Sequence, residues 1–499
     1  MNKNDIGLIG LAVMGQNLVM NLADHGYHTA VFNRSSEKTK MFIDESKTAA
    51  ALPENITAFY EIDTFVKSIS SPRRILLMVK AGDSVDAVIN SLLPHLEAGD
   101  LIADLGNSFF ADSLRREKTL SKKGILFAGV GVSGGEEGAR LGPSIMPGGS
   151  PEAAELLEST LASISAEVEN EDSSTARCCS WIGRGGSGHY VKMVHNGIEY
   201  GDMQIISEAY SLMTAGKQNS KFRLSNDQAS KVFETWNNSG LAGFLNEITS
   251  EILKYRDENG GHLVDSILDA AGQKGTGKWT VEESFNQARP VTVISEAVYA
   301  RALSSLKNLR LEASEHFSKE NSESPFGPEN TEDIISDLGD ALLASRVISY
   351  AQGFSLITAA SEHYEWNLNP GSIADIWRGG CIIRSALLTP ISNAYKNNRN
   401  LPSLLFDKYF SDLMNQLQSG WRRTAARGIM WGIPLPGITS ALSYFDGLRT
   451  KKLPANLIQA QRDYFGGHMY ERTDRPRGEF FHTNWSGRGG NTASTAYNA

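Results

Sequence analysis

The start of the chain constrains its fold more than any other segment. A short apolar run, Ile6 to Ile9, is followed by Gly10-Leu11-Ala12-Val13-Met14-Gly15 and then by a helical pattern through about Gly26. This is the glycine pattern of dinucleotide-binding folds with alanine in the middle position. Gly10 allows a tight turn, Ala12 lets the backbone approach a pyrophosphate, and Gly15 lets the helix pack closely on the strand. Because the N–H groups at a helix N-terminus favour an anion, strand, turn and helix together predict that these six residues bind a nucleotide.

The end of the second expected strand, Ala30 to Phe32, indicates which nucleotide is bound. Proteins that bind NAD carry an acidic residue at this point, which accepts a hydrogen bond from the ribose. This chain has Asn33-Arg34-Ser35 instead. An acid would repel a 2′-phosphate, whereas Arg34 can grip that phosphate and stack on adenine, and Asn33 and Ser35 can add donors. We therefore expect NADP as the cofactor.

Length and patterning predict several domains, because 499 residues exceed what one hydrophobic core supports. In the first part of the chain strand and helix signals alternate, as in a parallel, doubly wound sheet. Later the apolar residues recur with a helical period and few strand signals remain. We expect further strands at Arg74 to Val79, Leu101 to Leu105 and Ile125 to Val130. The fold class is α/β plus all-α: a Rossmann-type domain over residues 1–182, an all-helical domain over 183–450 and a C-terminal tail over 451–499.

The helical region contains a weak internal sequence repeat. Tyr200 to Gln204 resembles Tyr350 to Phe354, and the segment around Trp236 loosely matches the one around Trp377. We expect a duplicated helical domain, although two matches also leave a chance resemblance open. The tail is rich in Gly, Arg and aromatic residues, which is typical of a segment that is either frayed or held against another surface. A second subunit would supply such a surface.

Composition excludes some partners and compartments. The net charge of −9 argues against a nucleic-acid partner, and no apolar run is long enough for a membrane span. The N-terminus lacks the build of a signal or transit peptide. The chain has three cysteines, Cys178, Cys179 and Cys381. They are neither an even set that could pair into disulfides nor a pair with the spacing of metal ligands, and this usage suits a reducing compartment. We therefore expect a cytoplasmic protein.

One helical segment, Gly188 to Tyr200, gathers side chains that are able to do chemistry. Lysine, histidine, asparagine, glutamate and tyrosine fall at i, i+3, i+4, i+7 and i+8, which places all five on one helix face. They are Lys192, His195, Asn196, Glu199 and Tyr200. A solvated polar face is the simpler interpretation, but such a face rarely gathers these residue types without repeated charge pairs. The residues alone leave the two interpretations balanced.

Four segments resemble the 6-phosphogluconate dehydrogenases. The helix above is similar to the family's Lys-x-x-His-Asn-x-x-Glu-Tyr helix, and Gly131 to Arg140, Ile267 to Trp279 and Arg462 to His468 are similar to other signatures of the family. The matches are long and spread over nearly the whole chain, so the joint signal is very specific. Leu105 stands where the family usually has Gly, and Ser35 where it often has Thr; neither departure removes a functional group.

The resemblance implies oxidation and decarboxylation of 6-phosphogluconate to ribulose 5-phosphate with reduction of NADP. Lys192 matches the family's base, and Glu199 matches its acid. A lysine can act as a base only when it is partly neutral, which burial or nearby positive charge can achieve. The resemblance further implies a homodimer whose tail enters the neighbouring subunit.

The resemblance also assigns binding residues. The sugar acid and its carboxylate would be held by Asn107, Ser133, Gly134, Gly135, His195 and Asn196. The phosphate would be held by Tyr200, Lys274, Thr276 and Arg301, completed from the other subunit by Arg462 and His468. Beside the glycine loop, the cofactor would be contacted by Val79, Lys80, Ala81 and Asn107.

We predict no metal ion. Asp333, Asp337 and Asp340 share a helix face, but no His or further carboxylate completes a cation site, so we interpret them as a solvated acidic face. Two other functions stay open. A non-decarboxylating β-hydroxyacid dehydrogenase would lack Lys274, Arg301 and Arg462, and an NADP-binding sensor would not need both Lys192 and Glu199.

Overall fold

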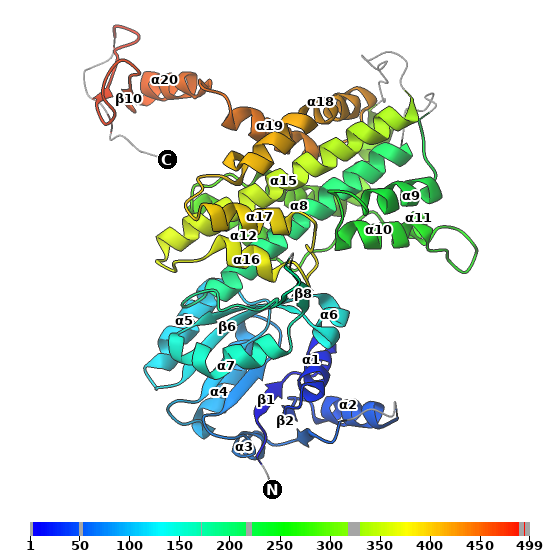
Figure 1. The fold of residues 1–499 in the computed structure, drawn as a ribbon. Helices are drawn as coiled ribbons and strands as arrows, with labels where there is room; N and C mark the ends of the chain where they lie inside the picture. Colours follow the sequence, from blue (N-terminus) through cyan, green and yellow to red (C-terminus); the bar gives the residue numbers. More distant parts are fainter. Residues whose placement is uncertain are drawn as a thin grey trace. The chain divides into compact units, whose positions relative to one another are not determined.

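The structure is a computed structural model that describes residues 3–48, 53–170, 172–215, 222–317, 330–488 and 494 (Figure 1). Its residues group into two compact units, Met1–Ala441 and Leu442–Ala499. Within the first unit the chain passes from a sheet to a set of helices between β9 (Thr175–Arg177) and α8 (Ser187–Ala215). This order of α/β domain, helical domain and tail is the predicted fold class.

A seven-stranded sheet forms the N-terminal domain. The strand order is β3-β2-β1-β4-β5-β6-β7, and all neighbours are parallel except β6 and β7. The order reverses between β1 and β4, so the end of β1 faces a crevice where ligands of such sheets bind. The strands are β1 (Ile6–Ile9), β2 (Thr29–Phe32), β3 (Ile56–Phe59), β4 (Arg74–Leu77), β5 (Leu101–Asp104), β6 (Leu126–Ser133) and β7 (Ser144–Gly149).

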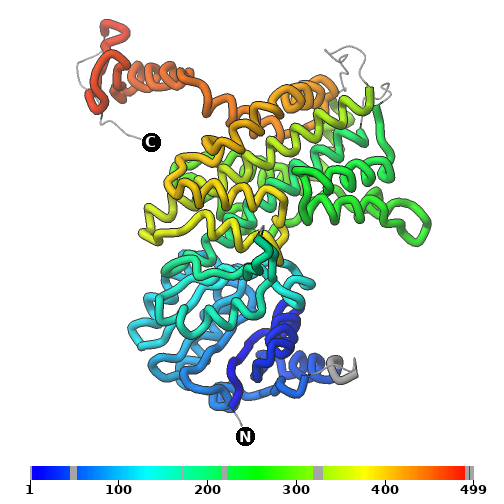
Figure 2. The backbone as a smooth tube through the Cα atoms, viewed as in Figure 1, coloured from blue at the N-terminus to red at the C-terminus, as the bar shows by residue number. Residues whose placement is uncertain are grey.

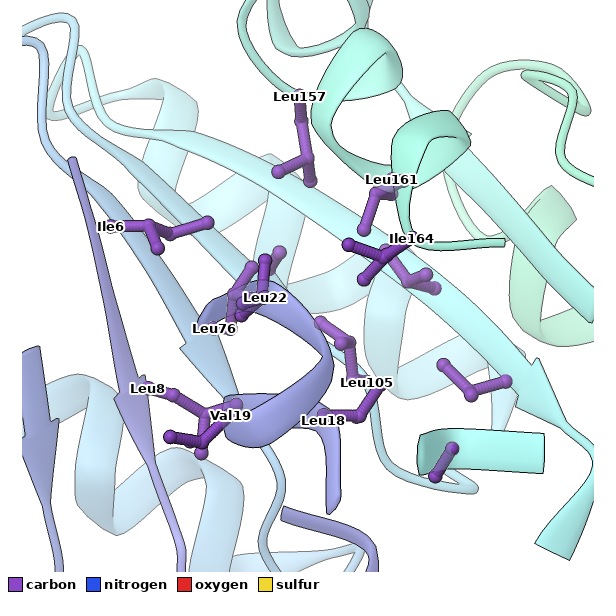
Figure 3. Packing of buried hydrophobic residues seen from close by; sticks show 14 of the residues in the cluster. Ile6, Leu8, Leu18, Val19, Leu22, Leu76, Leu105, Leu157, Leu161 and Ile164 are labelled. Carbon is purple, nitrogen blue, oxygen red and sulfur yellow. The ribbon is translucent and has the colours of Figure 1, made fainter. Parts of the chain in front are cut away.

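Two hydrophobic cores cover the two faces of this sheet. Helices α1 (Val13–Asp24), α6 (Gly135–Leu141) and α7 (Pro151–Ser163) pack on one face, where Leu18, Val19 and Leu22 lie against residues of the strands (Figure 3). Helices α3 (Ile62–Lys67), α4 (Asp83–Leu92) and α5 (Phe110–Ser121) cover the other face. Because both faces are buried, the central strands are apolar throughout rather than alternating.

Two long helices, α8 and α15 (Thr331–His363), lie side by side in the helical domain (Figure 2). Glycines let them approach closely: a Cβ at Gly201 would lie 2.6 Å from Ser349 Oγ, and one at Gly353 would lie 2.6 Å from Ile198 Cδ1. Shorter helices follow each long one, an arrangement that a duplication would give; the duplication itself stays a prediction. The helices after α8 are α9 (Asn226–Trp236), α10 (Phe244–Lys254), α11 (Leu263–Ser266), α12 (Thr276–Asn286), α13 (Thr292–Ser305) and α14 (Lys307–His316). Those after α15 are α16 (Pro370–Ile376), α17 (Leu388–Asn397), α18 (Lys408–Trp431) and α19 (Pro436–Leu448).

The smaller elements complete the first unit. Strand β9 pairs with β8 (Glu167–Glu169) in an antiparallel hairpin. Helix α2 (Ser36–Thr48) follows β2, and two short 3-10 turns lie at Leu93–His95 and Leu404–Phe406. None of the helices formed by the described residues is both long and apolar enough to cross a membrane.

The tail unit folds on itself around a buried carboxylate. It consists of α20 (Ala455–Gly466) and a small hairpin of β10 (Tyr470–Glu471) and β11 (Phe480–Phe481). Asp463 is fully buried, accepts hydrogen bonds from the Thr483 backbone N–H at 3.0 Å and Trp485 Nε1 at 2.7 Å, and lies 2.9 Å from His482 Nδ1. The described part of the tail is therefore ordered by its own contacts.

The acidic face on α15 is only partly the solvated face that we expected. Asp337 is 4% exposed and accepts hydrogen bonds from Arg423 and Arg427 of α18. Asp333 is exposed as expected, but the expectation was wrong for Asp337, because helical spacing shows which residues share a face but not what packs on it. Among the described residues no group of three His, Cys, Asp or Glu side chains could hold a metal ion, and all three cysteines are free thiols.

Candidate active site

The glycine loop after β1 has the geometry that a nucleotide phosphate requires. Gly10 has φ of +108°, and a side chain there would overlap the carbonyl of Met78. A Cβ at Gly15 would overlap the carbonyl of Gly10, so α1 can start this close to the strand only with glycine. Ala12 is the N-cap of α1 and offers no capping side chain, which leaves N–H groups of the first turn open to an anion.

A cavity of about 620 Å³ opens beside this loop, at the ends of β1, β2 and β4. Asn33 shapes it, because its Oδ1 accepts from the Leu11 backbone N–H at 3.2 Å and its Nδ2 donates to the Ser35 carbonyl at 3.2 Å. Arg34 lines the cavity together with Lys38, which the sequence analysis missed. Lys38 lies in the first turn of α2, a position that places a second cation near the end of β2.

Replacing Arg34 by alanine is expected to raise the KM for NADP by roughly 10- to 100-fold, the size of a lost charge-assisted hydrogen bond to a phosphate. The KM for NAD should change little, because NAD has no 2′-phosphate. Steady-state kinetics with both cofactors measure this. Lys40→Ala is the matched control, since Lys40 is an exposed cation of the neighbouring helix α2 that does not line the cavity. An equal loss with both cofactors would contradict the assignment.

A second cavity, of about 670 Å³, lies where the two domains of the first unit meet. Two loops of the sheet domain line it: residues 78–82 after β4 and residues 105–109 after β5. Lys274 and Trp279 of the helical domain line it as well. The cavity thus brings together Lys80, Asn107 and Lys274, residues assigned to cofactor, sugar acid and phosphate. Both cavities share Met78, Val79 and Lys80 in their walls.

Helix α8 begins directly on the sheet. A side chain at Gly188 would overlap the carbonyls of Gly129 and Met146, and one at Gly131 would overlap the Lys192 side chain. These close approaches bring the start of α8 against β6. Four of the five side chains on the predicted face are at most 9% exposed, and Glu199 is about one-fifth exposed. The interpretation as a solvated face is therefore wrong.

A chain of polar contacts crosses from the sheet domain to α12. Ser133 Oγ lies 3.2 Å from His195 Nε2, His195 Nδ1 lies 3.1 Å from Asn196 Oδ1, and Asn196 Nδ2 donates to Thr276 Oγ1 at 3.3 Å. Burial and the neighbouring Lys192 hold the pKa of His195 well below its usual value, so its ring is neutral. The contacts fit a ring that donates to Asn196 and accepts from Ser133.

The glycines after Ser133 open the turn into α6. Gly134 has φ of +123° and Gly135 has φ of +64°. A Cβ at Gly134 would also lie 2.6 Å from the carbonyl of Gly380. Backbone can therefore approach a ligand here without side chains in the way.

Burial shifts the pKa values of Lys192 and Glu199 in opposite directions. Burial lowers the pKa of Lys192 to about 8, against the opposing effect of the Glu199 charge. Burial also raises the pKa of Glu199, against the opposing effects of Lys192 and Arg301. A lysine that loses its proton near neutral pH and a carboxyl group that keeps one more readily are suited to act as base and acid. Cys381, fully buried beside Lys192, was not singled out as a site residue from the sequence.

Tyr200 and Arg301 stack at the far end of the face. The Arg301 guanidinium lies 3.5 Å from the centroid of the Tyr200 ring and donates to the Gly272 carbonyl at 3.3 Å. Thr276 is buried one helical turn from Thr280, while Lys274 is exposed. Four of the residues expected to bind the phosphate therefore lie in the first unit on α8, α12, α13 and the segment before α12. Arg462 and His468 belong to the tail unit, where Arg462 donates to Gln459, and their role in the phosphate pocket stays a prediction.

The fold and the site together define a pyridine-nucleotide-dependent dehydrogenase. The family model described as the NAD binding domain of 6-phosphogluconate dehydrogenase matches residues 5–183, and the one described as 6-phosphogluconate dehydrogenase, C-terminal domain, matches residues 188–485. The chain belongs to the 6-phosphogluconate dehydrogenase family.

Individual relatives agree with this assignment. The decarboxylating 6-phosphogluconate dehydrogenase of Aggregatibacter actinomycetemcomitans is 51% identical over 497 residues, with 99% of each chain covered. The decarboxylating enzyme 1 of Saccharomyces cerevisiae is 49% identical over 508 residues, also with 99% of each covered. The solved structure of Plasmodium falciparum 6-phosphogluconate dehydrogenase superposes with a TM-score of 0.90 at 43% identity, covering 96% of this chain and 100% of that one. That protein was solved in its apo form, with its cofactor NADP⁺ and with its substrate 6-phosphogluconate.

Proposed function

We propose that the chain catalyses the oxidative decarboxylation of 6-phosphogluconate to ribulose 5-phosphate and CO₂, with reduction of NADP to NADPH. The observation that carries this proposal is the pair of Lys192, which is buried, and Glu199, which is about one-fifth exposed, on one face of α8, with the pKa of the lysine lowered and that of the carboxyl group raised. The names of the relatives and the ligands of the P. falciparum enzyme support it.

Lys192 begins the reaction as a base. Its neutral amine removes the proton of the substrate's 3-hydroxyl while the C3 hydride departs. NADP, when bound, supplies the acceptor for that hydride. The resulting β-keto acid breaks its C1–C2 bond, CO₂ leaves, and the electron pair moves toward the 3-keto oxygen, where the Lys192 ammonium stabilises the charge.

Glu199 completes the reaction as an acid. The enediol that remains needs a proton on the carbon that lost the carboxylate. Glu199 lies two turns along the same helix face, and burial raises its pKa, so it can hold the proton for this step. Ser133, His195 and Asn196 would orient the sugar acid through the polar chain that joins them.

The rate of oxidation should depend on the protonation of Lys192. Because the base must be neutral and its pKa is about 8, kcat/KM for 6-phosphogluconate is expected to fall about tenfold per pH unit below that value. In Glu199→Gln this acidic limb of the pH profile should move to lower pH. The reason is that the carboxylate that stabilises the Lys192 ammonium is gone, which lowers the pKa of Lys192 further. Initial rates of NADPH formation across pH measure both limbs. A limb that stays in place in the variant would contradict the assignment to Lys192.

The described surface suits a homodimer, which we propose. Large apolar side chains are more than half exposed on α13 and α14, including Tyr299, Leu303 and Leu309, and Phe465 of the tail is 74% exposed. Apolar surface of this kind marks interaction sites. Arg462 and His468 would then serve the partner's phosphate pocket. The molar mass in solution tests this: a monomer of 54.4 kDa would overturn it. Free thiols suit a reducing compartment, and we place the enzyme in the cytoplasm.

A substrate panel tests the proposed function against its alternatives. With NADP, 6-phosphogluconate should be oxidised at least about 100-fold more efficiently than gluconate, because the cationic phosphate residues lose their partner in gluconate. Preference for unphosphorylated hydroxy acids would favour the plain β-hydroxyacid dehydrogenase. Tight binding of NADP without reduction would favour the sensor.

A further inference from the structure

We infer that Arg116 is a positioning residue that holds together the two loops lining the interdomain cavity, residues 78–82 and residues 105–109. The functional part of this inference rests on the proposed function, since those loops carry Lys80 and Asn107. Arg116 itself is not among the residues that line the cavity. It lies on α5, with a side chain that is 1% exposed.

The Arg116 guanidinium uses all three of its nitrogens. Nε donates to Asp86 Oδ1 at 3.0 Å, and one terminal nitrogen donates to Asp86 Oδ2 and to the Gly82 carbonyl, each at 3.0 Å. The other terminal nitrogen donates to Asp104 Oδ2 at 3.3 Å and lies 3.5 Å from Ser108 Oγ. The Arg116 side chain therefore holds the last residue of loop 78–82 and the start of loop 105–109.

Asp104 passes this restraint into the second loop. It is fully buried at the end of β5, accepts from the Gly106 backbone N–H at 3.0 Å and accepts from Ser108 Oγ at 2.6 Å. These two bonds bracket Asn107. The loops also touch, since a Cβ at Gly106 would lie 3.0 Å from the Val79 carbonyl.

Helix α5 links the same loops to the catalytic helix. Ser113, one turn before Arg116, lies 2.6 Å through its Oγ from Nδ1 of the fully buried His189. His189 lies one turn before Lys192 on α8. Cofactor loop, substrate loop and base are thus held from a single helix, so a loss at Arg116 should alter their spacing. Misplacement of a reacting group by about 1 Å lowers rates by about 100-fold.

The Asp86 carboxylate stays ionised over the working range of pH. Arg116 and Arg115 lower the pKa of Asp86 to about 2. A defect at Arg116 should therefore reduce the rate equally at all pH values near neutrality, without moving the limb that belongs to Lys192.

Matched substitutions of two adjacent arginines test the inference. Arg116→Lys keeps the charge but loses the fork, whereas Arg115→Lys changes an exposed residue that bonds the same Asp86 carboxylate and has no contact with Gly82 or Asp104 among the described bonds. Arg116→Lys is expected to lower kcat about 10- to 100-fold and to raise the KM for NADP. Its inhibition by 2′,5′-ADP, which reports the Arg34 end alone, should stay within about twofold of wild type. Arg115→Lys should match wild type throughout.

Several outcomes would overturn the inference. They are an unchanged kcat in Arg116→Lys, an equal defect in Arg115→Lys, or a loss of 2′,5′-ADP binding that parallels the loss for NADP. If Arg116→Lys does not fold, Asp86→Asn replaces it and should show a smaller defect of the same kind, because Asp86 is partly exposed and asparagine keeps only one of the two oxygens that orient the Arg116 guanidinium. If wild type does not oxidise 6-phosphogluconate, the proposed function fails, and calorimetric binding of NADP against 2′,5′-ADP still decides the role of Arg116.

Discussion

Lys192→Ala is expected to lose NADPH formation and CO₂ release together, with kcat lowered by about 10³-fold or more, at the upper range for removal of a general base. Both products disappear because oxidation precedes decarboxylation, so without the base no β-keto acid forms. The buried position of Lys192 and its pKa of about 8 are the physical reasons to assign it this role. Parallel assays of NADPH absorbance and CO₂ measure the effect.

Lys278→Ala is the control for this prediction. Lys278 lies on α12, is 62% exposed and pairs with Glu282 at 3.2 Å. It should retain the wild-type rate. Release of CO₂ by Lys192→Ala at a wild-type rate would show that another group acts as the base.

Glu199→Gln is expected to separate the first turnover from the steady state. The variant keeps Lys192 and the shape of the site, so a burst of NADPH should persist when enzyme and substrate are mixed. Steady-state turnover should fall by about 10²- to 10³-fold, because the enediol waits for a proton that the amide cannot supply. Rapid mixing followed by steady-state rates measures both phases.

Glu282→Gln is the control for this prediction. Glu282 is the exposed partner of Lys278 on α12, so the variant makes the same change of residue type outside the site. Loss of the burst together with the steady-state rate would mean that Glu199 acts before decarboxylation and not after it.

The sequence predicted the parts of this molecule that depend on local pattern. The glycine loop and the shared helix face from Lys192 to Tyr200 follow from spacing, and the order of domains follows from the change of pattern along the chain. Only the family resemblance indicated that this helix face is a site rather than a solvated surface. Strands β3 and β7 were missed, because β3 is partly exposed and β7 contains Pro147, Gly148 and Gly149, which are typical of turns.

What the sequence could not show depends on contacts between distant segments. Asp337 was placed on a solvated face because nothing in its own helix reveals Arg427, 90 residues away. Arg116 lies in a charged stretch of α5, a pattern typical of a solvated surface. Its side chain is nevertheless buried and bonds to Asp86 and Asp104, which are distant in the sequence. Nothing in the sequence around Asp463 distinguishes it from other polar residues of the tail. Its burial depends on contacts with His482 and Trp485, about 20 residues further along the chain.

The most direct test of the account measures NADPH and CO₂ from one reaction of the wild-type protein. The reaction contains NADP and 6-phosphogluconate labelled at C1, with a chelator present. The account predicts equal amounts of NADPH and labelled CO₂, undiminished by the chelator, because Lys192 and Glu199 carry the chemistry without a metal ion. NADPH without CO₂, or a reaction that the chelator abolishes, would contradict it.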